Sequence, residues 1–255
     1  MSEKKFAVII RTYRRKNGSS FNNLLRVVNF LNNQTYKNFK VFLIGDDYDD
    51  QEEFDKIVSM FPEDKIYSYN NNVSFRKGYF KIKKNKWCTG GMLANLIGLR
   101  QAIKEKFKYY VHLDDDDIWL NNHLETVNEV VDKFPKVGFI VSYSKYKNIH
   151  LPREFIGKKN IKIFYDNFKP RGANSVHSSW IVNLEYLGDT FLKIYEERLG
   201  KINMIKDGKI KEFEFKETDR TLLDKINNLQ KNKKVKCIFI PKCTVEKKTD
   251  GNIPE

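Results

Sequence analysis

Four consecutive aspartates, Asp114 to Asp117, are the residues of this chain whose type and spacing point most directly to chemistry. Two carboxylates about 5 Å apart repel each other by roughly 3 kcal/mol at an effective dielectric constant near 20, which a folded protein tolerates when a cation is shared or a pKa is raised. In an extended segment alternate side chains point the same way, so Asp114 and Asp116 would face one side. Such hard oxygen ligands suit Mg²⁺ or Mn²⁺, held together with water and phosphate oxygens. The alternative is that the run opens the next helix, with Asp117 as its N-cap.

The segments around this run alternate between short apolar strands and amphipathic helices. This alternation predicts an α/β fold with a mostly parallel central sheet and helices on both faces. Ligands on such sheets lie beyond the carboxyl ends of the strands, and the acidic run stands at one of those ends. The predicted strands are 6–10, 40–44, 65–69, 108–113 and 137–142, and the predicted helices are 24–31, 52–61, 89–106 and 119–134.

The second half of the chain is less regular, and we interpret it as completing the same domain. Strands are expected at 161–165, 210–215 and 235–240, and helices at 185–198 and 218–229. Lys247 and Lys248, near the end of the sequence, are expected in a solvated tail. The whole of 1–255 is therefore taken as a single domain.

Composition narrows the class of protein. The 255 residues include 14 % aromatic side chains, which excludes intrinsic disorder. The net charge of +14 attracts polyanions such as nucleic acid, acidic lipid surfaces or phosphorylated substrates, although a solvated lysine-rich surface explains it equally well. Three cysteines provide neither a disulfide framework nor zinc-site spacing. With no secretory segment and no apolar run of about 20 residues, we expect a cytoplasmic protein, with peripheral membrane association left open.

The acidic run and its neighbours together resemble family 2 glycosyltransferases with the GT-A fold. The segment HLDDDDIWLNNHLE is similar to the metal-binding motif of that family, and VIIRTYRR is similar to its first strand and nucleotide loop. Residues 24–47 and 89–97 resemble the family's next helix, second strand and later helix start. The resemblance covers 6–142 and implies a nucleotide-sugar donor, most often a UDP-sugar, with Mn²⁺ or Mg²⁺. It also implies a Rossmann-like nucleotide and metal half over 6–142 and an acceptor half over 143–255.

The resemblance assigns roles residue by residue. Asp114 would meet the ribose side and join Asp116 in binding the metal, and Asp115 is the variable position between them. Two departures stand out: Arg11 replaces a proline, and Tyr48 with Asp49 replaces a Gly-Ser pair. The expected nucleotide contacts are Thr12, Tyr13, Arg14, Asp46, Asp47, Asp114 and Asp115.

Transfer with inversion needs a carboxylate to take the proton of the acceptor hydroxyl. In the family this base belongs to a Glu-Asp pair that opens a late helix. Asp219 matches best and Glu217 is the runner-up, while capping of the helix by acids is the alternative. His177 and Trp180 lie in a region that would approach the donor sugar and the acceptor, although Trp180 fits the core as well. His177 could also supplement the metal or bind phosphate. Lys247 and Lys248 could close over the diphosphate, as the alternative to the solvated tail.

A second class of function uses the same features. A basic nucleic-acid-binding protein, or a metal-dependent nuclease or nucleotidyltransferase, would also need lysines and clustered acids. However, the lysine runs are dispersed, and the loop from Arg11 to Ser19 has one glycine where a phosphate loop needs several. We therefore expect a nucleotide-sugar donor and a glycan, lipid-linked or protein acceptor, and no nucleic acid.

Overall fold

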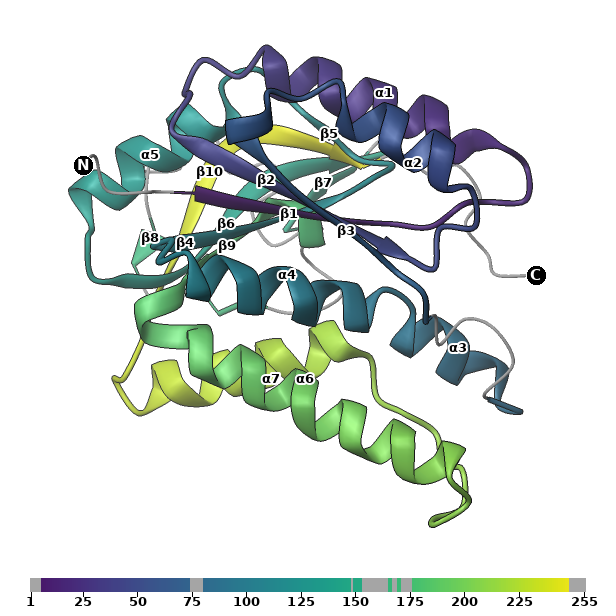
Figure 1. Ribbon diagram of the computed structural model, residues 1–255. Helices are drawn as coiled ribbons and strands as arrows, with labels where there is room; N and C mark the ends of the chain where they lie inside the picture. The colour runs from purple at the N-terminus through teal and green to yellow at the C-terminus, as the bar shows by residue number, and fades with distance from the viewer. Residues whose placement is uncertain are drawn as a thin grey trace.

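The fold is a β-sheet with helices on both faces (Figure 1). The computed structural model describes residues 6–73, 80–147, 149–152, 165–166, 169–170 and 176–247. The predicted α/β class is confirmed. The first half contains β1 (Phe6–Thr12), α1 (Ser19–Asn32), β2 (Phe39–Asp46), α2 (Gln51–Val58), β3 (Ile66–Asn71), α3 (Lys83–Thr89), α4 (Met92–Lys104), β4 (Tyr109–Asp114), β5 (Ile118–Trp119), α5 (His123–Lys133) and β6 (Val137–Tyr146). The remainder contains β7 (Ile149–Leu151), β8 (Tyr165–Asp166), β9 (Trp180–Asn183), α6 (Leu184–Lys206), α7 (Thr218–Lys231) and β10 (Lys236–Lys247).

The sheet has the strand order β3-β2-β1-β4-β9-β6-β10-β5. Strands β3, β2, β1 and β4 are parallel neighbours. Strand β9 runs antiparallel to both β4 and β6, so β6 and its parallel neighbour β10 point the same way as β4. The carboxyl ends of β3, β2, β1, β4, β6 and β10 therefore meet at one edge of the sheet, whereas β9 and the short β5, which is antiparallel to β10, run the other way.

Two apolar cores, one on each face, hold the helices against the sheet. Side chains of β1 alternate between them: Val8 belongs to the core under α1, α2 and α5, and Ile9 belongs to the core under α4, α6 and α7. This alternation is the expected period of a strand covered on both faces. Among the described residues no helix is both long enough and apolar enough to cross a membrane.

The predicted helix 89–106 is interrupted, because two glycines divide it. Helix α3 ends at Thr89, and α4 begins at Met92 after Gly91, whose φ of +70° is a left-handed conformation that favours glycine. The interruption aims the backbone N–H of Gly91 at Asp46, with a hydrogen bond of 2.9 Å to Oδ2.

The predicted helix 119–134 starts four residues late. Trp119 instead pairs with Val245 in the short strand β5 against β10. Its indole is 1 % exposed and donates to the backbone oxygen of Ser178 at 2.8 Å. Tertiary pairing with the end of the chain outweighs the local helical pattern here, and α5 begins at His123.

Of two strands predicted in the second half of the chain, one is absent from the structure and the other lies mostly outside the described residues. The predicted strand 210–215 is wrong, because Asn85 of α3 bonds both to the N–H of Phe215 and to the backbone oxygen of Phe213, each at 2.8 Å. A side chain thus replaces the neighbouring strand. Of the predicted strand 161–165, residues 161–164 lie outside the described residues, and Tyr165 begins β8.

Candidate active site

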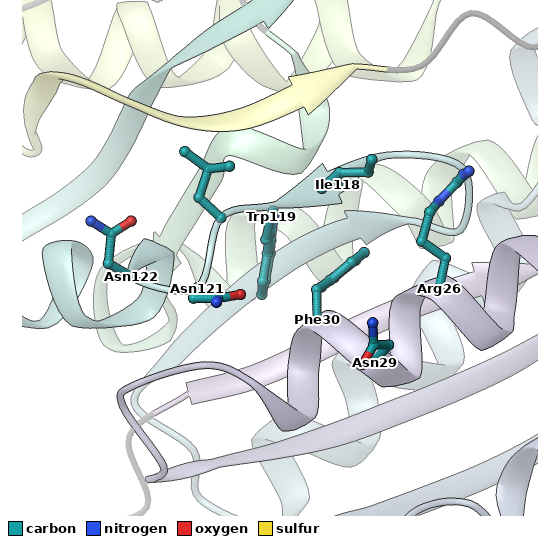
Figure 2. Close-up of a pocket in the computed structure, with 8 residues that line it drawn as sticks. Arg26, Asn29, Phe30, Ile118, Trp119, Asn121 and Asn122 are labelled. Carbon is teal, nitrogen blue, oxygen red and sulfur yellow. The ribbon is translucent and has the colours of Figure 1, made fainter.

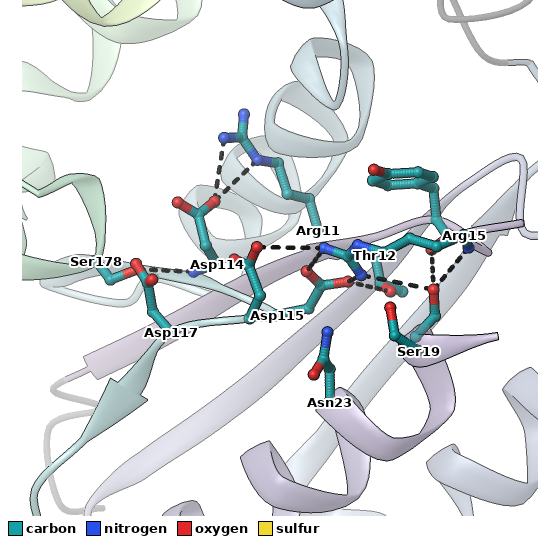
Figure 3. Close-up of polar contacts among 12 residues, drawn as sticks. Arg11, Thr12, Arg15, Ser19, Asn23, Asp114, Asp115, Asp117 and Ser178 are labelled. Atoms are coloured by element: carbon teal, nitrogen blue, oxygen red, sulfur yellow. Dashed lines mark hydrogen bonds and ion pairs between the residues drawn. The ribbon is translucent and has the colours of Figure 1, made fainter. Parts of the chain in front are cut away.

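The carboxyl ends of β1, β2 and β4 bring the predicted nucleotide and metal residues together. In the parallel register Arg11 lies beside Asp114, and Thr12 lies beside Gly45, one residue before Asp46. The edge formed by these strand ends, drawn in Figure 3, is where ligands of parallel sheets bind.

The four aspartates form a turn, not an extended segment. Asp114 ends β4, and the N–H of Asp117 donates to the backbone oxygen of Asp114 at 3.1 Å. The expected extended geometry is therefore wrong: Asp114 and Asp117 have partners of their own, while Arg15 contacts both Asp115 and Asp116, at 2.6 and 3.5 Å. We call residues 114–117 the acidic turn.

Asp114 is held by two cationic or polar neighbours. Its Oδ1 accepts from Arg11 Nε at 3.2 Å and Arg11 Nη2 at 3.1 Å, and it lies 2.9 Å from His112 Nε2. Burial raises the pKa of Asp114, but Arg11 and His112 outweigh it and lower this pKa well below its ordinary value. All three contacts converge on Oδ1, so Asp114 is an ionised carboxylate with one oxygen already engaged.

Asp115 joins the acidic turn to the loop after β1. Its Oδ2 accepts from Thr12 Oγ1 at 2.7 Å and from Arg15 Nη1 at 3.0 Å, while its Oδ1 accepts from Arg15 Nη2 at 2.6 Å. The Arg15 and Asp115 side chains are only 6 % and 5 % exposed. Both oxygens of Asp115 are thus engaged within the protein, and its predicted contact with a nucleotide remains a prediction.

The two remaining aspartates are harder to ionise. Burial, with the charges of Asp114 and Asp115, raises the pKa of Asp116 to about 6. Burial raises the pKa of Asp117 to about 7 even though Lys247 opposes this shift. A raised carboxyl pKa is what like charges held together out of water produce.

Asp117 is held by Lys247, the last residue of β10, and by Ser178, which lies just before β9. Lys247 ends β10 with its Nζ 3.6 Å from Asp117 Oδ1, so the expectation of a solvated tail is wrong for Lys247, while Lys248 lies outside the described residues. The Ser178 hydroxyl donates to Asp117 Oδ2 at 2.7 Å and accepts from the N–H of Asp114 at 2.9 Å. The carboxyl end of β10 thus reaches the acidic turn.

Stacked histidines connect the acidic turn to α7. The His112 and His177 rings lie 3.6 Å apart at an interplanar angle of 11°. His177 Nδ1 is 3.6 Å from Asp219 Oδ1. The predicted base is thereby linked to Asp114 through three contacts, by way of His177 and His112, although 105 residues separate the two carboxylates in the sequence.

Burial sets the charge states along this connection. It lowers the pKa of His112 and, with help from His112 and Arg11, lowers that of His177 well below the ordinary value, so both rings are neutral. The Asp219 side chain is 45 % exposed, yet the surrounding protein removes enough water to raise its pKa. Asp219 is therefore open to a ligand and has the character of a proton acceptor.

The other predicted residues lie around this centre. Asp46 is 3 % exposed and bound to Gly91, and Asp47 follows it in a left-handed conformation with φ +58°. Tyr13 lies under the guanidinium of Arg15, 4.8 Å from ring centroid to Cζ. Arg14 turns away toward α2, 3.3 Å from an oxygen of Asp50.

The structure places Trp180, a predicted sugar contact, and Glu217, the alternative base, in different surroundings. Trp180 is 1 % exposed and packs edge-on against Phe139, so its ring has no face for a sugar and belongs to the core. Glu217 precedes the first residue of α7 and makes no capping hydrogen bond with its side chain. Residues 171–175, beside His177, lie outside the described residues.

Among the described residues, several partners of the acidic turn were not predicted as site residues: Arg11, Arg15, Arg26, His112, Ser178 and Lys247. Arg11 and Arg15 could have been noticed, since they flank the predicted nucleotide loop and one of them replaces the family's proline. Ser178 and Lys247 carry no comparable local signal, because strand pairing far along the chain brings them here.

A separate pocket of about 410 Å³ lies on the α1 side of the acidic turn (Figure 2). From its wall Arg26 Nη2 donates to the backbone oxygen of Asp116 at 3.2 Å and to Asn23 Oδ1 at 3.0 Å. None of the predicted site residues lines this pocket. Its wall contacts the acidic turn through Arg26, and we infer that the wall supports the backbone of that turn. The lining residues are Arg26, Asn29, Phe30, Ile118, Trp119, Leu120, Asn121 and Asn122.

The cluster has the ligand types that a divalent cation uses. Potential ligand atoms of His112, Asp114 and His177 all lie within 4.8 Å of one another. His177 is 7 % exposed and neither ring nitrogen has a hydrogen-bond partner, which is costly unless a ligand or ion supplies one. Asp116 is not in this group, so its role as a metal ligand remains a prediction.

Known proteins match the chain along most of its length. The family model of Glycosyl transferase family 2 matches residues 7–184. An uncharacterized glycosyltransferase of Acanthamoeba polyphaga mimivirus is 32 % identical over 99 % of this chain and 97 % of its own length. An uncharacterized glycosyltransferase of Rickettsia bellii (strain RML369-C) is 27 % identical over 67 % of this chain but 21 % of its own length.

Solved structures share the fold. TarS 1–349 of S. aureus has a TM-score of 0.61 at 16 % identity, covering 95 % of this chain and 60 % of that one. The mannosyltransferase PcManGT from Pyrobaculum calidifontis, in complex with GDP-Man and Mn²⁺, has a TM-score of 0.58 at 14 % identity, covering 99 % and 59 %. The chain thus spans about 60 % of these two structures. In sequence and in fold, it belongs to glycosyl transferase family 2 and is a glycosyltransferase of the GT-A type.

Proposed function

We propose that this glycosyltransferase moves a hexose from a nucleotide-sugar, a UDP-sugar in the first instance, to an acceptor hydroxyl with inversion and with a divalent metal ion. In this proposal residues 6–142 supply the nucleotide and metal contacts, and 143–255 supply the acceptor side. The acceptor hydroxyl belongs to a glycan, a lipid-linked molecule or a protein.

The observation that carries the proposal is the contact path from Asp219 through His177 and His112 to Asp114. It places an exposed carboxylate of raised pKa beside the acidic turn. Sugar transfer needs both parts together: groups that hold the diphosphate leaving group, and a base that deprotonates the acceptor.

A divalent ion fits the residues that are present. Asp114 and Asp116 would hold it, with His177 as a nitrogen ligand whose orphaned ring nitrogens need a partner. When bound, the ion would offset the negative charge that grows on the leaving diphosphate. Carboxylate oxygens favour Mg²⁺ or Mn²⁺. The solved complex of PcManGT with GDP-Man and Mn²⁺ supports Mn²⁺ as the choice between the two.

Asp219 is the proposed base. Its exposed carboxylate would accept the proton of the acceptor hydroxyl as the oxygen attacks the anomeric carbon, and its raised pKa strengthens it as an acceptor. Arg11 pairs with Asp114, and its positive charge also opposes the rise in the pKa of Asp219, so it favours the ionised form of both carboxylates. Glu217 remains the alternative base.

The nucleotide would lie over the loops that follow β1 and β2. Thr12, Tyr13 and Arg14 would line its pocket, and Asp46 or Asp47 would accept a hydrogen bond from the base. Solved complexes of TarS with UDP-GlcNAc and of PcManGT with GDP-Man support a nucleotide-sugar donor.

Calorimetry with UDP tests the donor and the metal together. We expect UDP to bind in the presence of Mn²⁺, more weakly without it, and more tightly than GDP. Asp116→Ala should weaken Mn²⁺-dependent binding by at least about tenfold, while the matched surface change Asp189→Ala should not. A wild type that binds no nucleotide, or an Asp116→Ala protein with unchanged binding, contradicts the proposal. A screen of nucleotide-sugars for Mn²⁺-dependent hydrolysis would then identify the sugar without a known acceptor.

The base is tested separately. Asp219→Asn should bind UDP as the wild type does and lose about 10²- to 10⁴-fold in transfer rate. Glu217→Gln, two residues away and at the same helix end, is its control and should remain active. If Glu217→Gln is the inactive variant, the base assignment moves to Glu217.

A further inference from the structure

The amino ends of β4, β6 and β10, together with the carboxyl end of β9, form a surface rich in lysine at the edge of the sheet opposite the acidic turn. The segments that meet there are in contact: the N–H of Leu184 donates to the backbone oxygen of Lys108 at 2.9 Å, Asn183 Nδ2 donates to that of Val137 at 3.1 Å, and Val137 pairs with Lys236. Strands β4, β9, β6 and β10 thus present one continuous end. We call its exposed lysines the lysine pole: Lys104, Lys106, Lys133, Lys136, Lys231, Lys233, Lys234 and Lys236.

Helix stability explains only part of the lysine pole. The last residues of α4, α5 and α7 are lysines, which favour the negative end of a helix dipole. The other five stand in the following loops or at the start of β10. Lys106 and Lys233 have φ of +60° and +56°, at matching turns after α4 and α7. Glycine or asparagine adopts this left-handed conformation after a helix with less strain. The conformation of the turn therefore does not explain why lysine occupies these two positions.

Few acids offset this charge. In the described segments around the pole, Asp132 and Glu185 are exposed, and Glu105 is occupied by Lys40, with an Nζ to Oε2 distance of 3.0 Å. Eight exposed lysines therefore face two exposed acids. This imbalance creates a positive field on the side of the molecule away from the candidate active site.

We propose that the lysine pole docks this protein on an anionic membrane surface. Segments 104–108, 133–136 and 231–236 contain lysine but no arginine, and lysine acts as a flexible point charge, whereas arginine supplies the forked contacts used in nucleic-acid recognition. A row of exposed aromatic rings for stacking bases is missing from the described part of the pole, where Tyr186 alone is 38 % exposed. One ring at the edge of a lysine cluster suits the headgroup level of a bilayer.

A hollow at the pole gives a lipid headgroup a place to sit. It has a volume of about 280 Å³ and lies between the end of α4 and the start of α6. Lys106 and Lys108 line it together with the apolar side chains of Ile103, Phe107 and Leu184, and Glu185 is the acid at its rim. The lysine ammonium groups would contact the phosphate of a lipid headgroup, and the apolar side chains would contact the start of its acyl chain.

Docking at this end would turn the candidate active site away from the bilayer. The acidic turn follows the carboxyl end of β4, whereas Lys104 and Lys106 precede the amino end of the same strand. The membrane would therefore tether the enzyme, and its acceptor would approach from the water. Donor chemistry should therefore be the same with and without vesicles. This inference does not depend on the identity of the proposed donor or metal.

Co-sedimentation with vesicles tests the docking. We expect binding to vesicles rich in phosphatidylserine, little binding to pure phosphatidylcholine, and release as salt is raised. Each lysine near an anionic surface contributes about fivefold. The combined variant Lys231→Gln, Lys233→Gln, Lys234→Gln and Lys236→Gln should therefore weaken binding by about 600-fold. Donor hydrolysis by this variant should equal that of the wild type.

Two further variants separate the effect of the lysine pole from that of total charge and from misfolding. A charge-matched control places the same four changes on α6 and the segment after it, at Lys193, Lys201, Lys209 and Lys211, and should keep most of the binding. Lys106→Gly with Lys233→Gly removes two charges while relieving strain, so its expected loss of roughly 25-fold cannot come from misfolding. Absence of vesicle binding by the wild type, equal loss in the control, or binding to single-stranded RNA but not to vesicles would overturn the proposal.

Discussion

Replacing Arg15 with methionine should cost this protein a large part of its stability. The Arg15 guanidinium grips both oxygens of Asp115 at 2.6 and 3.0 Å, and both side chains are about 95 % buried. Methionine has a similar reach but leaves the Asp115 carboxylate in a dry site with only the Thr12 hydroxyl. Removing one partner of such a pair costs about 3–5 kcal/mol, against a total of roughly 5–15 kcal/mol for a folded domain.

Urea denaturation and thermal unfolding measure this loss. At about 2–4 °C per kcal/mol, the melting temperature should fall by roughly 6–20 °C. The control is Arg100→Met, which removes an ion pair of 2.7 Å with Glu196 whose side chains are 54 % and 47 % exposed. This change should cost no more than about 1 kcal/mol.

A second change separates charge from packing. Adding Asp115→Asn to Arg15→Met should recover at least about 1 kcal/mol, because the stranded carboxylate is the main source of the loss. Equal stability of Arg15→Met and Arg100→Met would refute the reasoning, since burial would then have no effect on the same chemistry. Failure of the second change to recover stability would assign the loss to packing.

Three further outcomes follow from single residues. Gly91→Ala should lose about 1–3 kcal/mol in urea denaturation, because φ is +70° and a Cβ would lie 2.5 Å from Arg11 Cδ; full stability would show that the helix break relaxes freely. Burial lowers the pKa of His123 from 6.5 to about 3. Between these two pH values the unfolded chain binds a proton at His123 that the folded chain does not. The free energy of unfolding therefore falls as the pH falls through this range. His123→Gln should flatten this fall by about 1 kcal/mol per pH unit between pH 6 and 4.5, and identical pH profiles would contradict the assignment. Trp180→Ala should cost about 3–5 kcal/mol, whereas Trp180→Phe should keep donor hydrolysis; loss of hydrolysis in a stable Trp180→Phe protein would return this ring to the sugar site.

Strands that are buried on both faces were the most predictable part of the fold. The apolar runs that begin at Phe6, Val41 and Tyr109 need no knowledge of their partners, because only a doubly covered sheet uses such continuous runs. Short elements such as β5 were less predictable, since Trp119 joins a strand through Val245, 126 residues later. Local periodicity contains no information about such a partner.

The candidate site divides in the same way. Thr12, Asp46 and the acidic turn could be located because strand ends on parallel neighbours share an edge. The directions of the four aspartates could not, because they depend on a turn and on Arg11, Arg15 and Lys247. These cations lie in β1, in the loop after it and at the carboxyl end of β10.

By itself, the sequence determined the α/β class, the edge of the sheet where chemistry would occur, and the acidic residues that belong there. These follow from local patterns, since apolar periodicity and the position of polar residues at strand ends are properties of short segments. Only the tertiary structure decided that Asp115 is bound by Arg15, that two stacked histidines connect Asp219 to Asp114, and that eight lysines form one pole. Each of these depends on which segments become neighbours, and strand order and register determine that over distances of a hundred residues and more.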